Sequence, residues 1–240
     1  MIRIFLPPED ITSKQIIIRG EQARHLSLVL RVKTGDSLAI FDGQGHRYIC
    51  KISSVHKKEV LAEKINKEPY SAESTVSITL AQGVPKGNKM DFIVQKSTEL
   101  GVKKIIPLIT EYSQVRKTGR IERWRKIALS ASQQSGREKI PEIAEPVNFK
   151  GFLAMNDICY GIIFSEGEKG QSLKKTLNDI QAANMITLLI GPEGGFSEDE
   201  VSTAIQKGFI SVSLGPRILR TETAPITALS IIQYELGDMG

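Results

Sequence analysis

The chain has 240 residues, which is enough for two modest domains or one large one. Hydrophobic residues make up 40% of the chain and charged residues 25%, a composition typical of a globular protein and unlike that of a disordered one. No run approaches the roughly 18 apolar residues that a membrane span needs. The apolar stretch at the start is too short for a signal peptide.

The net charge of +5 is unevenly distributed: the first 150 residues carry +10 and the last 90 carry −5. This asymmetry indicates that a polyanion docks on one part of the molecule, although solvated surface lysines would give the same pattern. Cys50 and Cys159 lie far apart, and the histidines have no metal-ligand spacing with them. We therefore expect a reduced, cytoplasmic protein with two core cysteines and no metal site, with a disulfide between the two cysteines as the alternative.

Residues 1–70 are predicted to form a small β-barrel, because short strands alternate with tight turns. The expected strands are Ile2–Leu6, Gln15–Ile18, Ser37–Phe41, Arg47–Val55 and Val60–Ile65. A helix is expected over Gly20–Leu30, with Ala23, Leu26, Val29 and Leu30 on one side. Residues 68–74 combine proline, small residues and charge without periodicity, which is typical of a linker.

From Val76 onward, strands alternate with helices. The expected strands are Val76–Ala81, Lys104–Ile109, Ile158–Phe164, Ile186–Ile190 and Ile210–Leu214. The expected helices are Lys89–Leu100, Arg120–Ser132, Thr223–Leu236 and one that begins with a capping box of Ser197 and Glu200 and ends at Gly208. This alternation predicts an α/β domain over residues 75–240, with a mostly parallel sheet covered by helices on both faces.

Two loops rich in glycine and proline follow consecutive strands of this domain. One is Ile190–Phe196 (IGPEGGF) and the other is Leu214–Thr223 (LGPRILRTET). In a parallel α/β sheet, ligands bind at the loops that leave the carboxyl ends of the strands. Neither a P-loop nor a Rossmann dinucleotide motif is present. A GPEGG stretch alone is often only a turn, but two such loops together indicate a site where backbone groups read a flat heterocycle.

The same loops carry a resemblance to a known family. Ile190–Ser197 and Leu214–Ala224 resemble the signature of the RsmE family of 16S ribosomal RNA uridine-N3 methyltransferases. Three upstream segments are also similar to family motifs: Arg24–Arg31, Gln95–Val102 and Ala131–Arg137. The similarity therefore covers almost the whole chain. The departures are small: Ser97 where alanine is common, and Ala224-Pro225 early in the last helix.

The resemblance implies a PUA-like RNA-binding barrel over residues 1–70 and a SPOUT methyltransferase domain over residues 75–240, threaded into a trefoil knot. It also implies a homodimer, S-adenosyl-L-methionine (SAM) as cofactor, and 16S ribosomal RNA, within a 30S subunit or its precursor, as substrate. The implied role is in ribosome biogenesis. The residues implied for the SAM pocket are Phe164, Ser165, Glu166, Ile190, Gly191, Pro192, Gly194, Gly195, Leu214, Gly215, Ile218, Leu219, Arg220 and Thr221.

Methylation of uracil needs a group that handles the N3 proton. A neutral uracil N3 is a poor nucleophile, so a base or a stabiliser of the developing anion is expected. Glu222 is the candidate base, and Arg220 a candidate for phosphate or carbonyl contact. In the alternative interpretation, Glu222 only favours the dipole of the last helix. Glu193 is expected to accept hydrogen bonds that shape its loop.

RNA contacts are expected from basic side chains in both domains, unless they are merely solvated. They are Arg24, His25, Arg31, Lys86, Lys89 and Lys96. Gln133, Gln134 and Arg137 are expected in the substrate cleft or a dimer contact. Two other functions stay open: a knotted methyltransferase acting on ribose 2′-OH or on transfer RNA, and a non-catalytic RNA-binding assembly factor. The glycine loops argue against the latter, since RNA contact alone does not require them.

Overall fold

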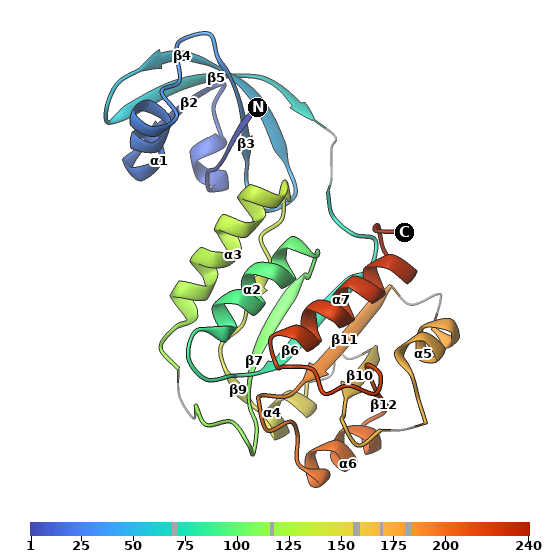
Figure 1. The fold of residues 1–240 in the computed structure, drawn as a ribbon. Helices are drawn as coiled ribbons and strands as arrows, with labels where there is room; N and C mark the ends of the chain where they lie inside the picture. The colour runs from blue at the N-terminus through green and yellow to red at the C-terminus, as the bar shows by residue number, and fades with distance from the viewer. Residues whose placement is uncertain (69–71, 116–117, 156–158, 169, 181–183) are drawn as a thin grey trace. The chain divides into compact units, whose positions relative to one another are not determined.

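The computed structural model describes residues 1–68, 72–115, 118–155, 159–168, 170–180 and 184–240, in two compact units (Figure 1). The first unit consists of Met1–Glu73 and Ser132–Ile140, and the second of Ser74–Ala131 and Pro141–Gly240. The range predicted for the second domain thus contributes one segment to the first unit. Part of the predicted linker, and Ile158 at the start of a predicted strand, lie outside the described residues.

The first unit is built on a curled five-stranded sheet. Its strands are β1 (Ile2–Phe5), β2 (Gln15–Arg19), β3 (Ser37–Phe41), β4 (Arg47–Val55) and β5 (Glu59–Glu68). They lie in the order β1-β3-β4-β5-β2; β1 and β3 are parallel, and the other pairs are antiparallel. A short 3-10 helix, η1 (Pro8–Ile11), follows β1. All five predicted strands are confirmed, and their inward side chains form one apolar core.

The predicted helix over Gly20–Leu30 is wrong in its second half. Helix α1 (Gly20–Arg24) passes into a π-helical turn, η2 (His25–Val29). Because this wider turn changes the rotation per residue, the side chains after Leu26 leave the core. Leu26 is fully buried, whereas Val29 is 66% exposed and Leu30 is 41% exposed. Arg31 then adopts a φ of 51°, which ends the turn.

Residues 132–140 complete the first unit through a buried carboxylate. The Glu138 side chain is fully buried and accepts hydrogen bonds from Arg3 and from the backbone N–H of Ala72. Arg47 lies 3.7 Å from the same carboxylate. Ion pairs of this kind need such multiple partners to offset the cost of removing the charge from water.

The second unit is built on a seven-stranded parallel sheet. Its strands are β6 (Ser77–Gly83), β7 (Lys104–Ile109), β8 (Glu142–Ile143), β9 (Val147–Asn148), β10 (Tyr160–Phe164), β11 (Met185–Ile190) and β12 (Ile210–Val212). The order is β12-β10-β11-β6-β7-β8, with β9 also paired to β7. Every described pairing in this sheet is parallel, as predicted.

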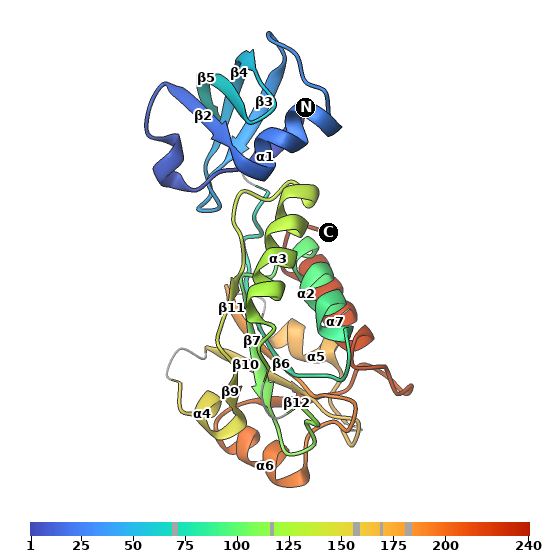
Figure 2. The same ribbon diagram turned by 90° about the vertical axis from the view of Figure 1, so that its left-hand side faces the viewer.

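Helices cover both faces of this sheet, which confirms the predicted α/β class. They are α2 (Lys89–Glu99), α3 (Ile121–Ser135), α4 (Phe149–Leu153), α5 (Leu173–Asp179), α6 (Glu198–Gln206) and α7 (Thr223–Glu235). Helices α2 and α7 lie on one face, and α4 and α6 on the other (Figure 2). The capping box of Ser197 and Glu200 is present.

The sequence does not predict some of the short helices and strands. Helices α4 and α5 and the two-residue strands β8 and β9 were not predicted, because so few residues carry no usable periodicity. The last strand ends at Val212, so Leu214 belongs to the loop and not to the strand. Cys50 is buried, but Cys159 is exposed and is not a core residue. The trefoil knot stays a prediction.

Candidate functional site

A cavity of about 890 Å³ lies where strands β10, β11 and β12 end. This volume is within the range of small-molecule sites, roughly 300–1,000 Å³. All the residues predicted for the SAM pocket line it: Phe164, Ser165, Glu166, Ile190, Gly191, Pro192, Gly194, Gly195, Leu214, Gly215, Ile218, Leu219, Arg220 and Thr221. The topology therefore brings together three segments that are far apart in the sequence, at the edge where a parallel sheet binds its ligands.

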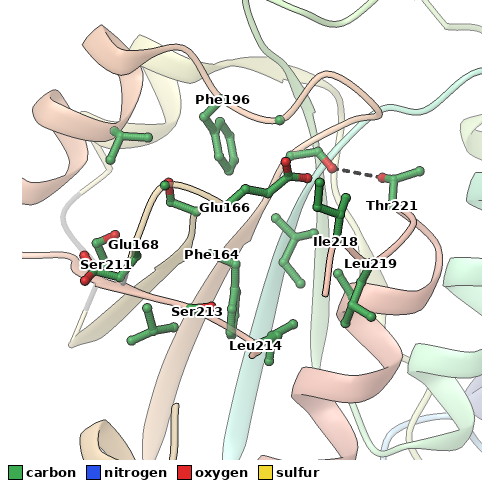
Figure 3. Close-up of a pocket in the computed structure, with 18 of the residues that line it drawn as sticks. Phe164, Glu166, Glu168, Phe196, Ser211, Ser213, Leu214, Ile218, Leu219 and Thr221 are labelled. Atoms are coloured by element: carbon green, nitrogen blue, oxygen red, sulfur yellow. Dashed lines mark hydrogen bonds between the residues drawn. The ribbon is translucent and has the colours of Figure 1, made fainter. Parts of the chain in front are cut away.

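The cavity floor is fixed by buried hydrogen bonds between neutral groups. Gln82, at the end of β6, donates its side-chain amide to the Gly191 carbonyl oxygen at 3.2 Å and to Thr221 Oγ1 at 3.3 Å. Thr221 Oγ1 in turn donates to the Gly191 oxygen at 2.9 Å, as the dashed line in Figure 3 shows. We refer to Gln82, Thr221 and Gly191 as the floor triad. It joins β6 to both glycine-rich loops.

Glycine is required where β6 passes the first loop. A Cβ atom on Gly83 would lie 2.4 Å from Pro192 Cδ and 2.5 Å from Pro192 N, closer than packed atoms approach. Within the second loop, Gly215 has a φ of 104°, a conformation that other residues rarely adopt. These two positions let the loops close around the cavity without a side chain between them.

Apolar side chains surround the cavity and leave space between them. Phe164 and Leu214 are half-buried, and Phe196 packs against Phe149 at 5.5 Å between ring centroids. Ile218 is 78% exposed although it lines the cavity, so it presents an uncovered apolar surface there. Figure 3 shows Ile218 and Leu219 on the side of the cavity nearest Thr221. An arrangement of this kind suits a flat, partly apolar ligand.

The sequence reading missed several lining residues, notably Glu168, Phe196 and Glu198. Glu166 had been predicted, and its side chain points into the cavity between Phe196 and Ile218 (Figure 3). Carboxylates at this position favour a ligand that carries positive charge. Glu168 also follows the end of β10, two residues after Glu166. That position is the sequence feature that could have predicted it in the cavity lining.

The rim of the cavity carries a cluster of charged side chains. Lys89 Nζ, in the first turn of α2, lies 2.8 Å from Glu193 Oε1 and 3.8 Å from Glu222 Oε2. Arg220 lies 4.0 Å from the other oxygen of Glu222. We refer to Lys89, Glu193, Glu222 and Arg220 as the rim cluster. Of these, Glu222 does not itself line the cavity, whereas the other three do.

Electrostatics and hydrogen bonds favour the charged forms of two members of the rim cluster, Lys89 and Glu193. Partial burial acts to raise the pKa of Glu193, but hydrogen bonds from Lys89 and from backbone N–H groups outweigh it and lower the pKa. One of these hydrogen bonds is donated by the backbone N–H of Lys86 to Glu193 Oε1, at 3.1 Å. The hydrogen bond to Glu193 raises the pKa of Lys89, and the charge of Glu222 adds to this effect. Glu193 therefore accepts hydrogen bonds that join its loop to the β6–α2 segment and hold Lys89; that it shapes its own loop stays a prediction.

Glu222 has unused hydrogen-bonding capacity. It occupies the N-cap position of α7, but its side chain makes no capping hydrogen bond. Its Oε2 atom is buried and accepts no hydrogen bond from the described residues. A buried carboxylate oxygen without a donor is costly in free energy, so this atom has room to accept a hydrogen bond from a ligand.

The residues predicted to contact RNA fall into both units. Arg24, His25 and Arg31 are exposed in the first unit. Lys86, Lys89 and Lys96 belong to the second unit, and of these only Lys89 lines the cavity. Lys96 is paired with Glu99 on its own helix at 2.8 Å.

Gln133 and Arg137, predicted in a substrate cleft or dimer contact, have partners within the first unit. Gln133 donates to the Arg3 carbonyl oxygen at 2.8 Å, and Arg137 is paired with Glu73 at 2.7 Å. Their role in the described structure is to join residues 132–140 to the rest of that unit.

Two classes of feature are not found within the described residues. They contain no group of three or more His, Cys, Asp or Glu side chains arranged to hold a metal ion. None of the described helices has the length and apolar character needed to cross a membrane.

Comparison with known proteins places the chain among RNA methyltransferases. Residues 72–233 match the model of an RNA methyltransferase domain, and residues 18–65 match that of an RNA methyltransferase PUA domain. The chain is 36% identical to the ribosomal RNA small subunit methyltransferase E of Buchnera aphidicola, covering 98% of this chain and 94% of the relative. It is 32% identical to that of Bacillus subtilis, covering 94% of each.

Solved structures of methyltransferases have the same fold as this chain. The ribosomal RNA small subunit methyltransferase E of Neisseria gonorrhoeae, bound to S-adenosyl methionine, superposes with a TM-score of 0.91 at 36% identity, covering 100% of both chains. A putative methyltransferase of Legionella pneumophila, in complex with the bound cofactor SAM, has a TM-score of 0.89 at 36% identity, covering 99% of this chain and 98% of the other. The chain therefore belongs to the ribosomal RNA small subunit methyltransferase E family.

Proposed function

We propose that this chain methylates N3 of a uridine in 16S ribosomal RNA, with SAM as the methyl donor. The observation that carries the proposal is the cavity, whose two glycine-rich loops are held together by the floor triad. The two SAM-bound relatives, each covering nearly the whole chain at 36% identity, support SAM as its occupant. SAM supplies an electrophilic methyl group when bound, and the protein supplies binding, orientation and electrostatics.

The cavity suits the adenine of SAM and its positively charged part. Backbone groups of the loops around Gly191 and Gly215 can read the edge of an adenine, and Leu214, Ile218 and Leu219 can enclose its faces. The carboxylate of Glu166, which points into the cavity, favours the positively charged end of the ligand. Ile218, Leu214 and Leu219 together present apolar surface to the cavity, and the faces of an adenine would cover it.

Glu222 is the proposed base. Its Oε2 atom, which accepts no hydrogen bond from the described residues and lies 3.8 Å from Lys89 Nζ, is at the rim, where a flipped uracil would meet the cavity. The carboxylate accepts the N3 proton, and the freed N3 electron pair takes up the methyl group. Arg220, with its side chain 83% exposed, contacts a phosphate or a carbonyl oxygen of the substrate.

The first unit supplies the main RNA-binding surface. Arg24, His25 and Arg31 are exposed there, in the part of the chain that carries the net positive charge. The match of residues 18–65 to a PUA domain of RNA methyltransferases supports this assignment. Lys86 and Lys96 add positive charge in the second unit. The RNA would be presented within a 30S subunit or its precursor, in the cytoplasm.

The protein acts as a homodimer in this proposal. Helix α7 has apolar residues on several sides: Leu229 and Ile232 are buried, Ile231 is half-buried and Tyr234 is 63% exposed. Phe92 on the neighbouring helix α2 is 46% exposed. A second copy would cover this apolar surface. Sedimentation of the protein, with Tyr234→Asp as the variant, should give twice the mass of the chain for the wild type and a smaller mass for the variant.

Nucleoside analysis of ribosomal RNA tests the function directly. We expect 16S ribosomal RNA from cells that contain the protein to yield 3-methyluridine, and RNA from cells without it to lack this nucleoside. Purified protein with SAM should restore it on small subunits from the deficient cells. Appearance of 2′-O-methyluridine, or of methylation only in transfer RNA, would instead support the ribose or transfer RNA alternative.

A further inference from the structure

Lys89 occupies a place that RNA backbone binding does not explain. It lines the cavity, and its ammonium group lies between Glu193 and the proposed base Glu222. Glu193 holds it at 2.8 Å and is itself fixed by the N–H of Lys86. An ammonium group has three N–H donors, and one is directed at Glu193. The hydrogen bond to Glu193 therefore holds the ammonium group at the rim of the cavity, beside Glu222.

We infer that Lys89 is a catalytic residue that stabilises the uracil anion formed when N3 loses its proton. This inference rests on the proposed function, since it requires N3 of uracil as the methyl acceptor. Removal of the N3 proton spreads one negative charge over N3 and the two ring carbonyl oxygens. Two cations of the rim cluster lie beside the proposed base, Lys89 and Arg220. Lys89 is the one that a second carboxylate, that of Glu193, holds in place, whereas the Arg220 side chain is 83% exposed.

The charge balance of the step explains why Lys89 belongs beside the base. Before proton transfer, Lys89 faces the negative charge of Glu222 at 3.8 Å. When the N3–H bond breaks and its proton goes to the Glu222 carboxylate, the negative charge moves to the uracil. Lys89 is then beside a neutral acid and an anionic ring, so its attraction follows the charge without rearrangement. Groups fixed in advance toward developing charge are the most effective stabilisers.

The anion is consumed in the next step. The N3 electron pair forms a bond to the methyl carbon, the carbon–sulfur bond breaks, and its electron pair stays on sulfur. The products are 3-methyluridine, S-adenosylhomocysteine and protonated Glu222, which releases its proton to solvent. Glu193 is a positioning residue in this scheme because it acts only through Lys89.

The variant Lys89→Met tests the inference, with Lys104→Met as its matched control. Both lysine side chains are 36% exposed and both pair with a glutamate, Lys104 with Glu142 at 2.9 Å, but Lys104 does not line the cavity. At saturating RNA and SAM, Lys89→Met should lower kcat by about 10²–10³-fold, the usual loss of one such stabilising group. Lys89→Arg should retain most of the activity, and Lys104→Met should match the wild type.

An RNA with 5-fluorouridine at the target separates anion stabilisation from other roles. Fluorine makes N3–H more acidic, so the anion needs less help and the defect of Lys89→Met should shrink by about tenfold or more. The double variant Lys89→Met/Glu222→Gln should lose little more than the worse single variant, because both groups act on one proton transfer. RNA affinity and its salt dependence, measured without SAM, should be unchanged in Lys89→Met.

Two results would overturn the inference. One is a normal kcat combined with weaker RNA binding and a smaller salt dependence, which would make Lys89 a phosphate contact. The other is the same defect on uridine and 5-fluorouridine. Failure of the proposed function is a separate result, since it appears in the wild type as a product other than 3-methyluridine.

Discussion

The floor triad and the rim cluster join the same parts of the second unit by different chemistry. Both connect the β6–α2 region, the loop of Gly191–Phe196 and the loop of Gly215–Thr223. The floor does so with buried neutral hydrogen bonds, and the rim with charges that are partly exposed. Buried neutral bonds do not depend on pH or salt, whereas exposed ion pairs contribute little to stability. In the proposed mechanism, the floor triad sets the shape of the cavity and the rim cluster carries out the proton transfer.

Filling the cavity should have the largest effect. Gly195 has a φ of 67° and open space beside it, so the indole of Gly195→Trp would occupy the ligand's volume. We expect SAM binding, measured by calorimetry, to be abolished. Gly208→Trp is the control, because Gly208 has a φ of 88°, equally open surroundings and no place in the cavity lining. Retained binding in the Gly195 variant would place the cofactor elsewhere.

Removing the base should affect turnover and leave the floor intact. Glu222→Gln should fold and bind SAM normally but lose activity by about 10²–10⁴-fold, the range for a general base. Raising the pH should restore part of the rate, since hydroxide can then ionise the uracil. Glu235→Gln, at the other end of α7, is the control. Full activity of Glu222→Gln would leave this residue as a carboxylate that only favours the helix dipole.

Weakening the floor triad should instead lower SAM affinity and leave kcat unchanged. Thr221→Val keeps the side-chain shape but removes the hydroxyl that donates to Gly191 and accepts from Gln82. The loss of about 1–3 kcal/mol for a buried hydrogen bond corresponds to about 5–150-fold in SAM affinity. Thr203→Val, which removes an exposed hydroxyl on α6, is the control. If Thr221→Val instead lowered kcat with unchanged SAM affinity, the division between floor and rim would be wrong.

The smallest effect is expected in the first unit, away from both sets of residues. Arg24→Ala combined with Arg31→Ala should weaken RNA binding and leave SAM affinity unchanged. For single-stranded RNA, the slope of log affinity against log salt should fall by roughly 0.7 for each phosphate that the variant no longer neutralises. Arg19→Ala, which removes an exposed arginine paired with Glu59, is the comparison. A slope that does not change would argue against the electrostatic role of this surface.

Local patterns predicted the strands well and the long-range contacts poorly. Arg47–Val55 and Lys104–Ile109 match β4 and β7 because alternation and apolar runs report burial directly. Val29 and Leu30 were misplaced because a π-helical turn has no sequence signature in a single chain. The cavity residues followed from motif resemblance, whereas Gln82 was missed. A lone glutamine at the end of an apolar strand was its only signal.

The charge of Lys89 alone does not predict its partners. Its charge suggested RNA contact, and only the meeting of β6 with the two loops revealed its glutamate partners. Neither Glu193 nor Glu222 is near Lys89 in the sequence, so no local pattern could have paired them. The same limit applies to Ser132–Ile140, whose partner Arg3 lies at the other end of the first unit's sequence.

The position of Glu138 bears on the order in which the newly made chain can fold. Met1–Glu73 leaves the ribosome first, yet the carboxylate that Arg3 and Arg47 surround comes more than sixty residues after that segment ends. Domains generally fold as units, the N-terminal one first, at about 5–20 residues per second of synthesis. Here the first unit waits several seconds for its last segment, during which a large part of the second unit has already emerged. A nascent chain halted before residue 132 should therefore carry an N-terminal sheet in which Arg3 lacks the Glu138 carboxylate, open to protease attack until synthesis resumes.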